Sequence, residues 1–137
     1  MNRFRVVEAT LNAELAKPYA YGNPAKSDCL FMGFAMVDAL TGSDLCGKYA
    51  GSYKTLIGAQ KRLRKHGHKS LVTAFAEELD QQPQGGAEAR FGDIAILRLD
   101  DGAEHVAICL GTRFVTKTPA GRQDHYLSEV IAAFHIG

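Results

Sequence analysis

Residues 27–42 read SDCLFMGFAMVDALTG, and this stretch predicts the element around which the rest of the chain folds. Its middle part, residues 30–37, is apolar almost all round, which is the pattern of a helix buried on every side. Ser27 or Asp28 is expected to cap this helix at its N-terminus, and Gly42 is expected to end it. We therefore expect a buried central helix over most of this stretch.

The segments before the central helix predict a second helix and a loop. Residues 3–16 carry apolar side chains at helical spacing, and these are Phe4, Val7, Leu11 and Leu15. Residues 17–24 contain two prolines and a glycine, which cannot continue a helix. The first helix should therefore end in a loop that leads to the central helix.

The remaining chain changes from helical to strand patterns near Gly92. Helices are expected at residues 54–66 and 70–79, followed by a flexible loop at residues 80–90. The expected strands are Ile94–Leu99, His105–Leu110, Arg113–Lys117 and Val130–Ile136. Helices first and strands second, without alternation, predict one α+β domain over residues 1–137, with an antiparallel sheet packed on the central helix.

Composition limits the classes of partner. The chain has 137 residues, 46% of them hydrophobic and 23% charged, and its formal net charge is +1. No strong field draws it to nucleic acid, and no apolar run approaches the length of a membrane span. The first residues break their apolar run with Glu8 and Asn12, unlike a signal peptide, so we expect a protein that is cytoplasmic when made. Three cysteines without a C-x-x-C pair predict neither a disulfide framework nor a zinc site.

Cys29 and His105 are the candidate catalytic residues. A thiol attacks a carbonyl carbon as thiolate, and the unpaired N–H groups at a helix N-terminus favour that anion. A histidine can then serve as ion-pair partner and proton shuttle. A small core cysteine and a surface histidine are the alternative interpretation. The position of Cys29, after a polar loop and beside Asp28, favours an activated thiol.

The other histidines and cysteines give weaker signals. His66 and His68 belong to the basic run at residues 61–69, which could touch phosphate but is typical of a solvated helix face. His125 and His135 have no partner at metal-ligand spacing, so we expect neither a metal nor another cofactor. The two remaining cysteines, Cys46 and Cys109, lack the setting of the first.

Four segments together resemble the NlpC/P60 cysteine peptidases. They read PYAYG at 18–22, DCLF at 28–31, FGDIAI at 91–96 and HVAICLG at 105–111. The family has, in the same order, a tyrosine-glycine loop, a DCSG helix, a GD turn before the first strand and an HVGIYLG strand. Residues 47–53, GKYAGSY, and the basic helix after them resemble NlpC/P60-like tail proteins of phages and prophages.

The resemblance implies a papain-like fold and hydrolysis of amide bonds in peptidoglycan stem peptides. Cys29 would be the nucleophile and His105 the general base and acid. Thr116 stands where the family places its third polar residue, usually a histidine, and its hydroxyl could accept from an imidazole N–H. Tyr19 and Asp28 would lie on the substrate and oxyanion side of the site, although Tyr19 could equally pack its loop onto the core.

Departures from the family pattern keep a second function open. Bulky Leu30 and Phe31 replace the small residues after the nucleophile, where they either narrow the groove or pack into the core. Together with Thr116, they favour an inactive papain-like scaffold with a structural role in a phage tail or its assembly. A third possibility is acyl transfer to another acceptor, or hydrolysis of a different amide or thioester, by the same dyad. The implied partner is a peptidoglycan peptide, and the resemblance leaves open other phage tail proteins as partners and association with the virion.

Overall fold

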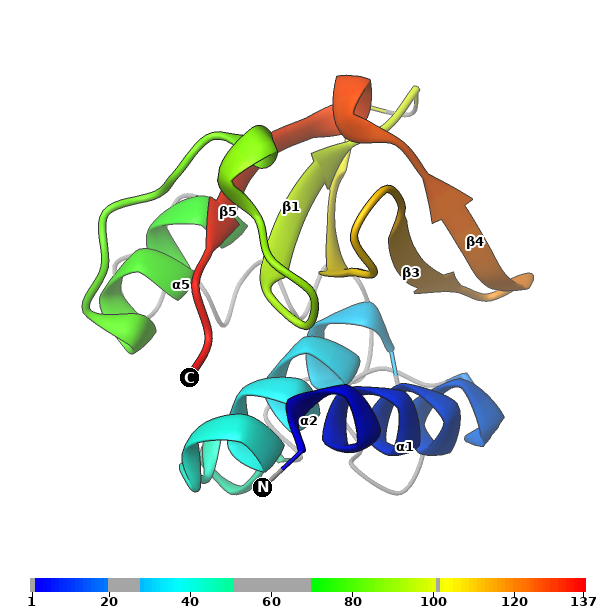
Figure 1. Ribbon diagram of the computed structural model, residues 1–137. Coiled ribbons are helices and arrows are strands. Elements are labelled where there is room, and N and C mark those ends of the chain that lie inside the picture. The colour runs from blue at the N-terminus through cyan, green and yellow to red at the C-terminus, as the bar shows by residue number, and fades with distance from the viewer. Residues whose placement is uncertain (1, 20–27, 51–69, 101) are drawn as a thin grey trace.

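A five-stranded antiparallel sheet forms the upper layer of the molecule in Figure 1. The computed structural model describes residues 2–19, 28–50, 70–100 and 102–137. The strand order is β4-β3-β2-β1-β5. The strands are β1 (Ile94–Arg98), β2 (Glu104–Cys109), β3 (Phe114–Thr118), β4 (Gly121–His125) and β5 (Val130–Phe134). The sheet and its antiparallel pairing confirm the expected α+β class.

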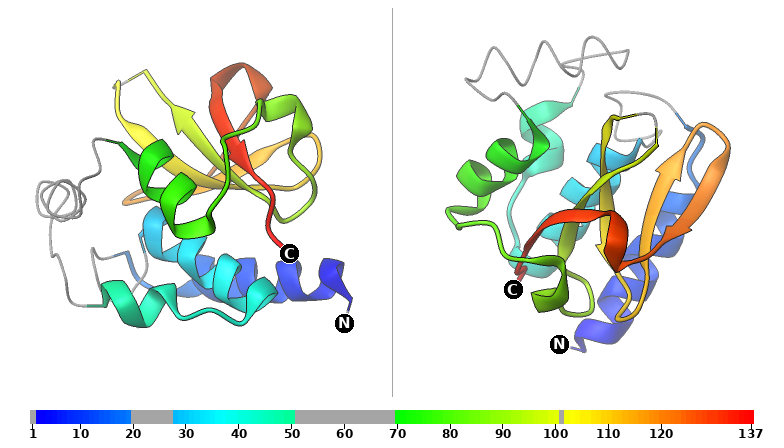
Figure 2. Two further views of the ribbon diagram at one scale, coloured as in Figure 1. Left: turned by 90° about the vertical axis from the view of Figure 1, so that its left-hand side faces the viewer. Right: turned by 90° about the horizontal axis from the view of Figure 1, so that it is seen from above.

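Two long helices, α1 (Arg3–Ala16) and α2 (Cys29–Thr41), lie in a layer below this sheet (Figure 1). They pack on each other, and α2 also packs on β2 and β3. The short α3 (Leu45–Tyr49) follows α2, while α5 (Leu71–Leu79) lies beside β5 (Figure 2). The expected helix at residues 54–66 lies outside the described residues. Among the described helices, none is both long and apolar enough to cross a membrane.

The caps of α2 are those that the sequence predicts. Asp28 is the N-cap, and its carboxylate accepts a hydrogen bond of 2.8 Å from the Phe31 N–H. Gly42 is the C-cap, with a φ of 77°, a left-handed conformation that glycine adopts without strain. Because both ends are fixed by local side chains and backbone, the position of Cys29 in the first turn follows directly from the sequence.

The main core lies between α2 and the sheet. Apolar side chains of α1, α2, α5 and all strands but β4 are buried there, including Val7, Phe31, Phe75, Val106 and Phe134. A second, smaller cluster lies on the other face of the sheet and contains Leu97, Ala107 and Cys109. Leu30 and Phe31 are buried in the main core, so the bulky residues after Cys29 fill space inside the domain and do not narrow a groove.

Two elements were not predicted. The edge strand β4 reads GRQDH, and its polar residues lack the apolar alternation that marks a strand. It forms because it pairs with β3 along its whole length, from Gly121 opposite Thr118 to His125 opposite Phe114. The short α3 is started by Asp44 and by Asp38, whose carboxylate accepts from two backbone N–H groups of that helix.

Candidate functional site

The Cys29 thiol lies where β2 and β3 separate. Paired residues of these two strands run only from Cys109 opposite Phe114 to Ile108 opposite Val115. Beyond that point the first turn of α2 meets both strands, and the Cys29 sulphur has hydrogen-bonding neighbours in the Val106 backbone and the Thr116 hydroxyl. The sequence predicted the helix position of Cys29, and the tertiary fold adds these two neighbours.

Thr116 is fully buried beside Cys29. Its hydroxyl donates a hydrogen bond of 2.7 Å to the Val106 carbonyl on β2. A hydroxyl has one proton to donate and two lone pairs that accept. With its proton on the Val106 carbonyl, the Thr116 oxygen presents lone pairs to its surroundings, and the neighbouring thiol is one of them. The observed contacts of Thr116 thus differ from the expected one with the imidazole of His105.

The pKa of the Cys29 thiol is raised from 9.0 to about 12, chiefly by burial. The Asp28 carboxylate contributes to this rise, because a negative charge beside the sulphur disfavours a second one. Hydrogen bonds from the Val106 backbone, the Thr116 hydroxyl and the Cys29 amide act in the opposite direction but are outweighed. Burial and Asp28 thus act against the activation that the helix N-terminus and a histidine were expected to provide.

His105 is the second residue of β2 and is partly buried. It lies opposite Leu97 of β1 and directly precedes Val106, whose backbone contacts the Cys29 sulphur. Side chains alternate along a strand, so His105 shares a sheet face with Ala107, and Val106 faces α2. The structure thus brings the Cys29 thiol to the backbone of Val106, whereas strand alternation places the His105 side chain on the sheet face of Ala107, away from α2.

Asp28 and Tyr19 complete the set of expected site residues. The Asp28 carboxylate is buried and caps α2, so its observed role is structural. A carboxylate there would repel an oxyanion, so the cap favours the structural role over the expected oxyanion role. Tyr19 is partly buried and follows the C-cap of α1. The tyrosine-glycine residues after it lie outside the described residues.

A buried lysine, which the sequence analysis did not identify, anchors β3 to α1 near this site. Lys117 follows Thr116, and its ammonium donates to the carbonyls of Glu14 at 2.7 Å and Lys17 at 2.6 Å. These carbonyls lie at the C-terminus of α1, where a helix leaves its last C=O groups without partners. Desolvation lowers the pKa of Lys117, while the charges of Glu14 and Asp28 raise it. In the sequence, the only indication of a role for Lys117 was its position directly after Thr116, an expected site residue.

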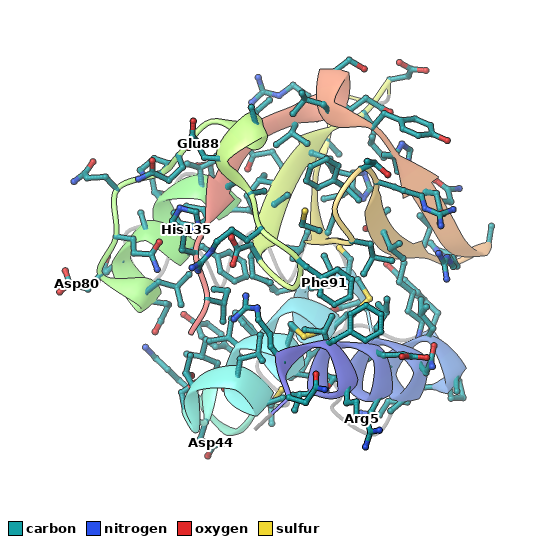
Figure 3. All side chains as sticks on the ribbon, viewed as in Figure 1. Arg5, Asp44, Asp80, Glu88, Phe91 and His135 are labelled. Carbon is teal, nitrogen blue, oxygen red and sulfur yellow. The ribbon has the colours of Figure 1, made fainter. Side chains whose placement is uncertain are left out.

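The GD turn holds the two chain ends on the sheet. Asp93 is fully buried, and its carboxylate has several polar neighbours. It accepts hydrogen bonds from the Arg3 guanidinium at 3.0 Å, the Ile136 N–H at 2.9 Å and the Arg90 N–H at 2.8 Å. It also contacts Nδ1 of His135 at 2.8 Å. Figure 3 labels Phe91, which directly precedes Gly92 in this turn, and His135, whose ring contacts Asp93. The motif is thus a structural clamp.

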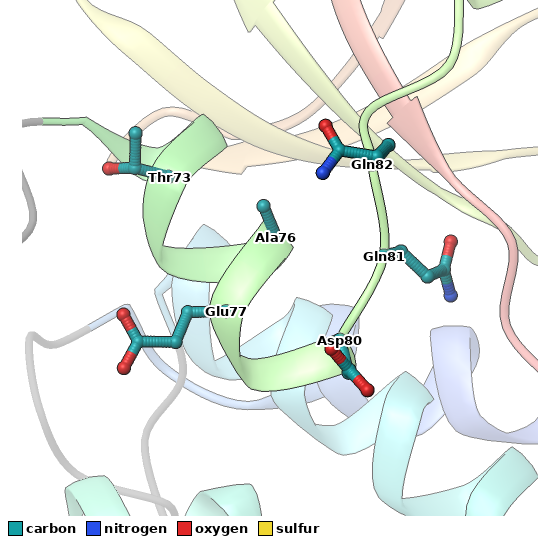
Figure 4. Close-up of a pocket in the computed structure, with 6 residues that line it drawn as sticks. All are labelled: Thr73, Ala76, Glu77, Asp80, Gln81 and Gln82. Atoms are coloured by element: carbon teal, nitrogen blue, oxygen red, sulfur yellow. The ribbon is translucent and has the colours of Figure 1, made fainter.

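Two further features were tested as sites. An open cavity of about 430 Å³ lies between α5 and the chain that follows it (Figure 4). Its lining is Thr73, Ala76, Glu77, Asp80, Gln81 and Gln82, which offers carboxylates and amides but neither a thiol nor an imidazole. Within the described parts of the chain, no group of three or more His, Cys, Asp or Glu side chains could hold a metal ion.

Fold and site together define an α+β domain with a cysteine at the head of its central helix, packed at a gap in an antiparallel sheet. Residues 2–136 match the family described as Domain of unknown function (DUF6950), and the chain belongs to that family. A comparison with curated proteins found no match.

Proposed function

We propose that this protein is a papain-like cysteine peptidase or amidase of the NlpC/P60 type, acting on amide bonds of peptidoglycan stem peptides. One observation carries the proposal: the Cys29 thiol, in the first turn of α2, contacts the backbone of the residue that follows His105. The order of the four NlpC/P60-like segments in the sequence supports the same assignment.

The proposed reaction is acyl transfer through a thioester. For this reaction the His105 side chain has to turn round the start of β2 to the Cys29 thiol, where it takes the proton as the sulphur attacks the substrate carbonyl carbon. The oxyanion accepts from the Cys29 N–H in the first turn of α2 and from the Tyr19 hydroxyl. The C–N bond then breaks, and the imidazolium returns its proton to the leaving amine. Water, deprotonated by His105, hydrolyses the thioester and releases the thiol.

The test is digestion of purified peptidoglycan, with the soluble products identified by mass spectrometry. The wild type should release peptides, and both Cys29→Ala and His105→Ala should release none. Cys46→Ala is the matched control, because Cys46 is also a partly buried cysteine with a pKa raised to about 12, yet it lies at α3. Full activity of a folded Cys29→Ala variant would contradict the mechanism.

A catalytically inactive scaffold with a structural role in a phage tail is the second candidate. The raised pKa of Cys29 favours it, and so does a threonine at the third polar position. This alternative predicts that the wild type releases nothing from peptidoglycan and that His105→Ala leaves the alkylation rate of Cys29 unchanged. It also predicts that the protein co-purifies with tail proteins in virions, a location that the active enzyme would share.

A further inference from the structure

We infer that Thr116 is a positioning residue for Cys29, whose hydroxyl turns from the Val106 carbonyl to the sulphur when the thiol loses its proton. The inference rests on the proposed function only in taking Cys29 as the nucleophile. It differs from the role that the sequence resemblance implies, in which the third polar residue holds the histidine ring.

The geometry of β2 and β3 supports this role. The ladder between the two strands stops at Ile108 opposite Val115, so Thr116 and Val106 are not joined by paired backbone groups. The Thr116 side chain closes that gap with its hydrogen bond of 2.7 Å to the Val106 carbonyl. Its fully buried position keeps water from replacing the hydroxyl as the neighbour of the sulphur.

Hydroxyl chemistry gives the two states of this hydrogen-bond chain. With Cys29 neutral, the thiol proton points to the Thr116 oxygen, and the Thr116 proton goes to the Val106 carbonyl. With Cys29 ionised, the same hydroxyl rotates and donates to the thiolate. A hydrogen bond to a charged group is stronger than one between neutral groups, so the rotation stabilises the anion more than the thiol. Only a torsion changes, and no atom is transferred.

The first experiment compares alkylation rates of Cys29 with iodoacetamide at about pH 9, where the rate follows the thiolate fraction. Peptide mapping separates Cys29 from Cys46 and Cys109. Thr116→Val should slow alkylation of Cys29 by about tenfold, because it removes a hydrogen bond to the anion at nearly constant shape. Thr116→Ser keeps the hydroxyl and should restore the wild-type rate.

Thr118→Val is the matched control on the same strand. The Thr118 hydroxyl lies two residues further along β3 and contacts the Gly121 carbonyl at 3.3 Å in the hairpin. Its loss should leave the alkylation rate unchanged. Equal rates for wild type and a folded Thr116→Val variant would overturn the inference, as would an equal slowing by Thr118→Val.

A second measurement uses the wild type and so does not depend on the stability of Thr116→Val. The infrared S–H band of Cys29, isolated as the difference between wild type and Cys29→Ala, should lie at the lowered frequency of a hydrogen-bonded thiol. A band at the frequency of a free thiol would overturn the inference.

These results separate the inference from the proposed function. If the alkylation and infrared results hold but peptidoglycan is never cleaved, Thr116 positions the thiol and the peptidase assignment fails. If peptidoglycan is cleaved and Thr116→Val alkylates as fast as wild type, the peptidase assignment stands and the role of Thr116 fails. If both hold, Thr116→Val should lower kcat with little change in KM, because its hydroxyl faces the nucleophile.

Discussion

Gly33 sets the distance between α2 and β2, and its replacement gives a sharp test of the packing at the site. A Cβ atom added at Gly33 would lie 2.6 Å from Val106 Cγ1, 3.5 Å from Phe75 and 3.6 Å from Ile94. The first distance is far inside van der Waals contact, and the other two are ordinary. Gly33→Ala should therefore push α2 away from the strand that carries His105.

The magnitude follows from two opposing effects. Overpacking a filled core costs about 1–3 kcal/mol, whereas alanine in a helix interior recovers about 1 kcal/mol over glycine. We expect Gly33→Ala to lower the free energy of unfolding by about 1 kcal/mol, or a few degrees in Tm for a domain of this size. Denaturant unfolding followed by circular dichroism measures this change.

A double-mutant cycle with Val106→Ala tests the cause. Val106→Ala alone leaves a cavity and should be destabilising, but in the double variant the new Cβ of residue 33 occupies the vacated space. The combined loss should be smaller than the sum of the two single losses by about 1–2 kcal/mol. If Gly33→Ala were stabilising, or if the two losses simply added, the steric reasoning would be refuted.

Three further predictions concern the charged groups and the thiol. Asp93→Ala should lower the unfolding free energy by about 3 kcal/mol, because the Arg3 guanidinium loses its buried partner. Burial acts to raise the pKa of Asp93, yet hydrogen bonds from Ile136, His135 and Arg90 lower this pKa below 3.8. The stability from Asp93 is therefore complete above the pKa of Asp in the unfolded chain and is lost as the pH falls through the pKa of Asp93 in the folded protein. A series of urea unfolding curves from about pH 6 downward should show a shallower decline in stability for Asp93→Ala than for the wild type. Lys117→Met should lower the free energy of unfolding by about 1–3 kcal/mol in thermal unfolding, because the carbonyls of Glu14 and Lys17 lose the ammonium as a donor. Lys48→Met, at a half-exposed ion pair, should lower it by less than about 1 kcal/mol. Equal losses would argue against a role for Lys117 in capping α1. Finally, Cys29 should react with iodoacetamide at about pH 8 far more slowly in the folded wild type than in urea, because its pKa is raised to about 12, chiefly by burial. Mass spectrometry of the quenched protein measures the extent of labelling. Rapid labelling of the folded protein would show that the thiol is ionised at rest.

The parts of the fold that sequence predicts are those fixed by local rules. The span of α2 follows from Asp28, Gly42 and the apolar run between them, and α1 follows from spacing alone. The inner strands are apolar and were predicted to within about two residues. By contrast, β4 is polar and depends on pairing with β3, a long-range property that no local pattern encodes.

The site shows the same division. The helix start and the strand pattern predicted where Cys29 and His105 lie, whereas Thr116 was singled out only by the resemblance to NlpC/P60 peptidases. The sequence could not predict that Thr116 donates to the Val106 carbonyl, since that contact exists only where β2 and β3 separate. Nor could it predict that burial and Asp28 raise the pKa of Cys29, because burial is set by the tertiary fold.

A neutral resting thiol changes what the histidine must do. Because burial raises the pKa of Cys29, we expect the resting thiol to keep its proton near neutral pH. The proton has to leave as the sulphur attacks, which makes His105 a general base for the attack itself. A thiolate formed from a thiol of high pKa is also the stronger nucleophile, and this offsets part of the cost of forming it. The hydrogen bonds from Val106 and Thr116 then act at the moment when the charge appears, which is where stabilisation accelerates a reaction.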